Sequence, residues 1–129
     1  MAYRKSELLV ITKAKELCAY VMTVTQKSPK AYRYTFVSRL QNLSLDVIEH
    51  LYRANDMYVA PGKLEYYRQR FELQRRAMTD LRLLCYIAEI SAKQGCILMK
   101  QYEQISKQAG DCQNLLGAWV SSDRKRLGV

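Results

Sequence analysis

Residues 64–92 read LEYYRQRFELQRRAMTDLRLLCYIAEISA, and this stretch decides the fold class. Its mainly apolar residues recur in alternating steps of three and four, a spacing that places them on one face of an α-helix. No Gly or Pro interrupts the stretch. We therefore predict one long helix, and its buried stripe is expected to be Leu64, Tyr67, Phe71, Gln74, Met78, Leu81, Cys85, Ala88 and Ala92.

Turn-forming residues bound this helix, and helical patterns continue beyond them. An Ala-Pro-Gly turn precedes it, and Gly95 follows it. Upstream, a second helix is expected to begin at Pro29 or Lys30, because a proline is tolerated at a helix start. Its stripe has the same spacing and comprises Phe36, Leu40, Leu43, Val47, His50, Ala54 and Met57.

The outer helices complete the pattern. A first helix is expected to run from Ser6, whose hydroxyl can cap free N–H groups, to Thr25. Gly110 and Gly117 in the last helix are expected to mark the close approach of another helix. The stripe of that last helix is Leu98, Tyr102, Ile105, Ala109, Cys112, Leu116 and Trp119.

Four helices with short connections predict an all-α fold, an antiparallel up-down-up-down four-helix bundle. With 129 residues the chain is expected to form a single domain, residues 1–129, that ends in a basic polar tail at about 121–129. Ile48 and Leu51 widen the stripe of the second helix, as expected for a helix that contacts two neighbours or a second subunit.

The sequence predicts a cytoplasmic protein without a membrane partner. The first apolar run, residues 8–11, is far shorter than a signal-peptide core or a membrane span. The four cysteines form no Cys-x-x-Cys pair, so we interpret them as small apolar residues in a reducing compartment.

No arrangement of residues predicts an enzyme. The chain has a single histidine, His50, and Val47 stands three residues before it, so the Glu-x-x-His motif of di-iron bundles is absent. We interpret His50 as a hydrogen-bonded core or interface residue rather than a metal ligand or catalytic base. There is no Gly-rich phosphate loop. The sequence therefore predicts no catalytic residue, no metal, no cofactor and no small-molecule substrate.

The positive signal is charge. Lys and Arg number 21 against 12 Asp and Glu, a formal net charge of +9, and such an excess attracts polyanions. Residues 19–45 contain no acidic residue, and Tyr32, Tyr34 and Phe36 are interleaved with their cations, Lys27, Lys30, Arg33 and Arg39. Cations could pair with phosphates and exposed rings could stack on unpaired bases, although Phe36 is expected in the core stripe.

Two more basic groups have alternative interpretations. Arg68, Arg75 and Arg82 repeat every seven residues, with Arg76 beside them, and would form a basic rail about 20 Å long. Alternatively they belong to a solvated face on which Glu72 pairs with Arg75 or Arg76. The third group lies in the tail, as a binding site or as a frayed solubilising end, and consists of Arg124, Lys125 and Arg126.

Three segments resemble the four-helix bundle protein family. They are residues 33–55 (RYTFVSRLQNLSLDVIEHLYRAN), residues 74–89 with Leu-Arg-Leu-Leu, and residues 102–119, which begin Tyr-Glu and end Leu-Gly-Ala-Trp. The family includes proteins encoded in intervening sequences of bacterial 23S ribosomal RNA genes and the accessory variability proteins of diversity-generating retroelements. The ending, followed by basic residues, looks more like the retroelement branch.

The resemblance implies a homopentameric barrel whose basic surface binds a reverse transcriptase and its RNA or DNA during mutagenic copying. From resemblance and charge together we predict a nucleic-acid or polymerase surface at Lys27, Lys30, Arg33, Arg68, Arg75, Arg76 and Arg82. The alternatives are a protein of the 23S intervening-sequence type, or an oligomeric scaffold without nucleic acid. Salt-sensitive binding to RNA would distinguish a nucleic-acid-binding protein from such a scaffold.

Overall fold

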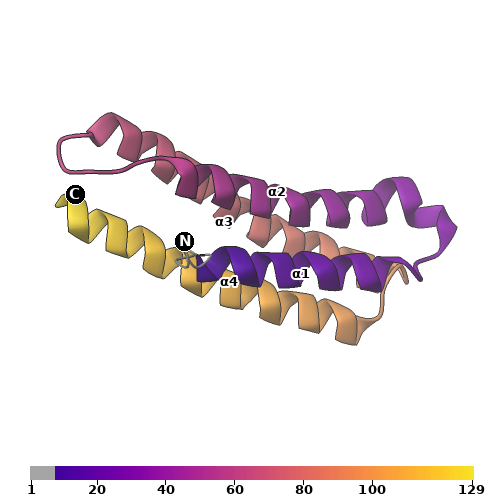
Figure 1. Ribbon diagram of the computed structural model, residues 1–129. Helices are drawn as coiled ribbons and strands as arrows, with labels where there is room; N and C mark the ends of the chain where they lie inside the picture. Colours follow the sequence, from indigo (N-terminus) through magenta and orange to yellow (C-terminus); the bar gives the residue numbers. More distant parts are fainter. Residues whose placement is uncertain (1–7) are drawn as a thin grey trace, which may run out of the picture.

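The computed structural model describes residues 8–129, which form four α-helices (Figure 1). They are α1 (Leu9–Thr25), α2 (Ser38–Asp56), α3 (Leu64–Lys93) and α4 (Met99–Leu127). Successive helices run in opposite directions, so the predicted antiparallel four-helix bundle is confirmed at the level of fold. The expected start of the first helix at Ser6 lies outside the described residues.

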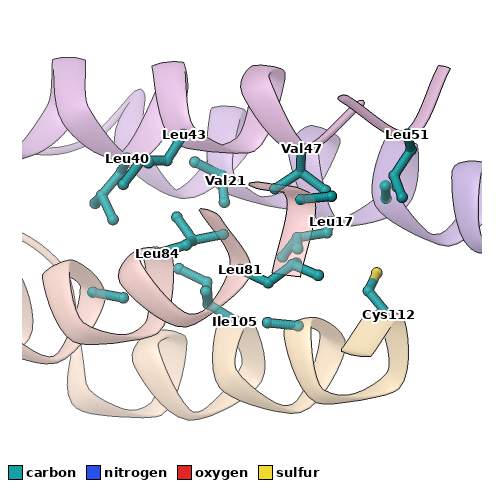
Figure 2. Packing of buried hydrophobic residues seen from close by; sticks show 14 of the residues in the cluster. Leu17, Val21, Leu40, Leu43, Val47, Leu51, Leu81, Leu84, Ile105 and Cys112 are labelled. Atoms are coloured by element: carbon teal, nitrogen blue, oxygen red, sulfur yellow. The ribbon is translucent and has the colours of Figure 1, made fainter. Parts of the chain in front are cut away.

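The helices pack in the order of the sequence, each against its neighbours, and α1 also packs against α4. The core between them is aliphatic and contains side chains from all four helices (Figure 2). Leu17 of α1, Leu40 of α2, Leu84 of α3 and Ile105 of α4 are each at most 1% exposed. Burying one such side chain contributes roughly 1.5–3 kcal/mol, which explains why the helices associate.

The buried stripe of α3 differs from the prediction. Every second predicted residue is buried, namely Tyr67, Gln74, Leu81 and Ala88. The buried residues that lie between these four were not predicted, and they are Arg70, Ala77, Leu84 and Ser91. The predicted Phe71, Met78, Cys85 and Ala92 are only half-buried, and Leu64 is exposed. Both sets alternate by three and four, so spacing alone could not distinguish them. The larger apolar side chains favoured the wrong set, because the sequence did not show that Arg70 has a buried partner.

The start of the second helix is also more complex than predicted. The helical path begins at Lys30, but as a 3₁₀ turn, η1 (Lys30–Tyr32), and a π-helical turn, η2 (Arg33–Val37), before α2. In α2, Leu40, Leu43, Val47 and Ala54 are buried as expected. Leu51 is buried where His50 was expected, and His50 lies at the edge of the core.

The C-terminal tail is a helix. In α4, Ile105, Ala109, Cys112 and Leu116 are buried as predicted. Leu98, also predicted, precedes the helix and is 57% exposed, and Tyr102 and Trp119 are only half-buried. The helix then continues through residues that were expected to form a polar tail, and it ends at Gly128, which has a φ of 72°. The prediction that Gly110 and Gly117 mark a close helix approach is wrong, because a Cβ at either position meets no atom within 4 Å.

None of the helices in residues 8–129 has the length and apolar character needed to cross a membrane.

Candidate nucleic-acid interface

Residues 27–39 contain the four cations and three aromatic rings noted above, and we call them the basic aromatic segment. This segment lies at the end of the bundle where the α1–α2 and α3–α4 connections meet (Figure 1). Two hydrogen bonds attach this segment to the α3–α4 connection. The Ser28 hydroxyl donates to the Cys96 carbonyl oxygen at 2.8 Å, and the Tyr32 hydroxyl donates to the Gln94 carbonyl oxygen at 2.7 Å. The segment is therefore held on a rigid part of the fold, which lowers the entropy cost of binding a ligand.

The three aromatic rings of this segment differ in their exposure. Tyr32 and Phe36 pack against the hydrophobic core and against each other, with ring centroids 5.6 Å apart. Tyr34 is 85% exposed. The sequence could not determine which ring would be exposed, because the change from 3₁₀ to π-helical geometry alters the angle between successive side chains.

The four cations of this end are all exposed. Within residues 8–129, neither Lys27, Lys30, Arg33 nor Arg39 forms an ion pair. Because no carboxylate neutralises them, their charges add, and they create a positive potential at this end of the bundle. We call these four residues the basic end.

The four α3 arginines of the predicted rail are exposed as predicted, but two of them have a partner. Arg75 Nε lies 3.5 Å from one Glu72 carboxylate oxygen, and Arg76 Nε lies 3.6 Å from the other. The alternative interpretation, a solvated face with ion pairs, therefore describes these two residues. Arg68 and Arg82 are exposed without an ion pair in the described part of the chain.

The C-terminal cations lie at the opposite end of the bundle from the basic end (Figure 1). Arg124 and Lys125 are exposed, and Arg126 donates from Nη2 to Asp123 Oδ1 at 3.2 Å. These cations also occupy the last turn of α4, where positive charge stabilises the helix dipole.

The eleven predicted cations thus lie in three places. Gln94, which contacts the basic end, is 12 residues beyond Arg82 and 26 beyond Arg68 on α3. By the helical rise, these arginines lie about 18 Å and about 39 Å along the axis from Gln94. These distances refer to Gln94, whereas Arg39 of the basic end lines a hollow together with Ile87, which is five residues beyond Arg82. The role of each group stays a prediction.

His50 is hydrogen-bonded, and its partner is Asp80 of α3. His50 Nδ1 lies 2.6 Å from Asp80 Oδ2, and both side chains are half-buried. Burial raises the pKa of the Asp80 carboxyl above 3.8, and the hydrogen bond and charge of His50 act in the opposite direction. The sequence did not identify Asp80, because its proximity to His50 depends on the register of α2 against α3.

No group of three or more potential metal-ligating side chains occurs in residues 8–129. All four cysteines are free thiols, and Cys18, Cys96 and Cys112 are buried. Burial raises the pKa of the Cys112 thiol to about 11. Since the thiolate is the reactive form, these observations favour the interpretation of the cysteines as apolar core residues.

Comparison with known proteins gives a fold and no family assignment. No protein-family model and no curated protein matches the chain. Among solved structures, the chain is similar to a protein of unknown function from the S23 ribosomal protein family of Bacteroides thetaiotaomicron. The TM-score is 0.69 and the identity 13%, over 86% of this chain and 97% of that chain. At this identity the similarity shows the fold alone.

Proposed function

We propose that this protein is a non-enzymatic nucleic-acid-binding protein whose basic end contacts phosphates. The observation that carries the proposal is the basic end itself, where four exposed cations without ion pairs lie on an anchored segment beside an exposed aromatic ring. Charge-assisted contacts from Lys and Arg dominate the affinity of proteins for phosphate backbones. The rest of the positive net charge adds long-range attraction.

The partner that we propose is a reverse transcriptase with its RNA and DNA. This part of the proposal rests on the resemblance of residues 33–55, 74–89 and 102–119 to the accessory proteins of diversity-generating retroelements. A protein of the 23S intervening-sequence type is the second candidate, and the fold shared with a protein of the S23 ribosomal protein family favours it.

Charge reversal tests the basic end. The variant Lys27→Glu/Lys30→Glu/Arg33→Glu changes the net charge by six units. Its matched control, Arg53→Glu/Lys63→Glu/Lys107→Glu, makes the same change at exposed positions outside the three candidate groups. The control leaves the contact between Arg126 and Asp123 intact.

Affinity for a fluorescent structured RNA is measured by anisotropy at several salt concentrations. We expect the basic-end variant to bind much more weakly, and the slope of log affinity against log salt to fall by about one for each phosphate that the variant no longer neutralises. The control should retain most of the affinity. Equal reductions in both variants would contradict the assignment to the basic end, and no binding by the wild type at low salt would leave the scaffold hypothesis.

We also propose that the chain assembles as a homopentamer. Large apolar side chains remain exposed on the single chain, as expected if subunits cover some of them, and they include Leu45, Leu83, Ile90, Leu98 and Met99. The number five comes only from the family resemblance. Light scattering at several concentrations tests it, and a mass of 15.1 kDa throughout would contradict it.

A further inference from the structure

We propose that Tyr34 and the hollow beside it bind an unpaired base, so that the ligand of the basic end is single-stranded nucleic acid. This inference rests on the proposed function and makes it more specific. Its starting point is the contrast between Tyr34, which is 85% exposed, and its neighbours Tyr32 and Phe36, which pack against the core. An exposed ring held on an anchored segment can stack on a base of any sequence.

The hollow beside Tyr34 has the size and lining that a base requires. Its volume is about 440 Å³, within the range of roughly 300–1,000 Å³ found for ligand pockets. Phe36 and Ile87 supply apolar surface, while Ser38, Arg39 and Asn42 supply polar groups. A flat base with an apolar face and a polar edge fits such a mixed lining.

Asn42 is placed to contact the edge of a base. Its Nδ2 donates to Ser38 Oγ at 3.3 Å, which leaves the amide oxygen as an acceptor in the hollow. Arg39 on the same lining supplies donors and positive charge. A base inserted between these groups and Tyr34 would gain both stacking and hydrogen bonds.

Two further cations lie close in the sequence to the proposed base site. Lys30 and Arg33 line a second hollow of about 220 Å³, together with Ser28 and Gln26. Arg33 and Tyr34 are consecutive residues, so a strand whose base stacks on Tyr34 would bring a neighbouring phosphate close to these cations. Since the bases of a duplex already stack on one another, this arrangement favours a single strand.

Other exposed tyrosines lack this combination. Tyr86 lies in a hollow with Arg82, but Glu89 also lines it and would repel a phosphate. Tyr52 lies on α2 between Glu49 and Asp56, which line its hollow. Of these three tyrosines, Tyr34 is the one at which exposure, a mixed lining and cations without an ion pair among residues 8–129 coincide.

The test compares Tyr34→Ala with Tyr34→Phe, which keeps the ring, and with Tyr52→Ala, which removes a ring that is 63% exposed in an acidic surrounding. The probes are a fluorescent 20-nucleotide oligouridylate, the same strand paired with oligoadenylate, and an oligonucleotide that carries one 2-aminopurine. Affinity is measured by anisotropy, and stacking is measured by quenching of the 2-aminopurine emission.

We expect Tyr34→Ala to weaken single-strand binding by about 5- to 100-fold and to abolish the quenching, since stacking on one aromatic ring has an effect of this size. Duplex affinity should change little, and Tyr34→Phe and Tyr52→Ala should resemble the wild type. Unchanged oligouridylate affinity in Tyr34→Ala, while Lys30→Glu/Arg33→Glu abolishes binding, would overturn the base site and leave the proposed function standing. A wild type that binds none of the three probes would overturn both.

Discussion

The two ends of the bundle core are stabilised by different chemistry. Towards the basic end the core is aliphatic, with Leu84 of α3 and Ile105 of α4 fully buried among other apolar side chains (Figure 2). Fourteen residues earlier on α3, about 21 Å away by the helical rise, Arg70 is buried against Asp123 of α4. The continuous buried stripe of α3 therefore has two parts. We call the apolar part around Leu84 the oily half, and the part around Arg70 the charged half.

The charged half is a network of hydrogen bonds. Arg70 donates from Nε and Nη2 to the two Asp123 carboxylate oxygens, at 2.8 Å in each case, and from Nη1 to the Met57 carbonyl oxygen at 3.2 Å. Gln74 adds a donor to Asp123 at 3.0 Å, and the guanidinium lies 4.8 Å from the Trp119 ring centroid. The network connects α3, α4 and the end of α2.

This contrast shows that burial alone does not indicate how a position contributes to stability. An aliphatic side chain tolerates any apolar neighbour of suitable size, whereas a buried guanidinium requires one partner in one geometry. The charged half therefore fixes the register of α3 against α4 more strictly than the oily half. The predictions that follow test this difference.

The largest effect is expected at Asp123, which is 3% exposed. Asp123→Ala leaves the Arg70 guanidinium buried without its carboxylate, and we expect a loss of about 3–5 kcal/mol in the free energy of unfolding. Urea unfolding followed by circular dichroism measures this loss.

Two further variants test the interpretation. Arg126→Ala removes only an exposed donor to the same carboxylate, so its effect should stay below about 1 kcal/mol. The double variant Arg70→Met/Asp123→Leu should recover part of the stability, because it leaves no buried charge without a partner. Recovery should be incomplete, since Gln74 Nε2 and the Met57 carbonyl oxygen lose their partners. A double variant less stable than Asp123→Ala would contradict this account.

In the oily half, Leu84→Ala should lower stability by about 2–5 kcal/mol, because the cavity adds to the lost transfer free energy. The neighbouring Leu83 is 37% exposed, and Leu83→Ala should therefore cost much less. Here we expect a conservative replacement, Leu84→Met, to lower the free energy of unfolding by less than about 1.5 kcal/mol. If Leu84→Met were as damaging as Leu84→Ala, the oily half would depend on exact side-chain shape as much as the charged half does.

The sequence predicted much of the oily half, although it assigned a buried position of α3 to Cys85 instead of Leu84, and it missed the charged half. Leu40, Val47, Ile105 and Leu116 follow a spacing that needs no knowledge of their partners. By contrast, Arg70 is buried only because Asp123, 53 positions away, meets it. A charged residue in a long helix is normally assigned to the surface. Without knowledge of the pair, Arg70 was left out of the predicted core stripe and Asp123 fell in the predicted polar tail.

The candidate interface was predictable in composition but not in geometry. The absence of acids in residues 19–45 indicated the basic end directly. The exposure of Tyr34 depends on the π-helical turn, and the turn depends on how Tyr32 and Phe36 pack against the core. Such contacts between distant segments leave no local pattern in a sequence.

A smaller effect is expected at the half-buried pair of Asp80 and His50. Burial raises the Asp80 pKa, while His50 and, more weakly, Arg76 lower it and Asp46 raises it. His50→Ala should therefore move the Asp80 pKa further above 3.8, and Arg76→Ala should move it less in the same direction. Titration of the Asp80 carboxyl ¹³C shift measures both changes.

The sign of the effect on stability follows from linkage. Because the folded carboxyl holds its proton more tightly than the unfolded one, stability decreases as the pH rises from the unfolded pKa of about 3.9 through the folded pKa. His50→Ala should extend that decrease to higher pH. A lower Asp80 pKa in His50→Ala would show that the imidazole does not stabilise the carboxylate, unlike the guanidinium at Asp123.

The smallest effect is expected at Gly117, which lies on α4 next to the charged half. A Cβ at this position meets no atom within 4 Å, so Gly117→Ala should raise stability by about 0.4–1 kcal/mol through better helix propensity. Gly95→Ala should do the opposite, because Gly95 has a φ of 84°. If Gly117→Ala instead lowered both the stability and the mass seen by light scattering, another subunit would pack against α4 there. The charged half would then lie at a subunit contact, and its strict geometry would also align the assembly.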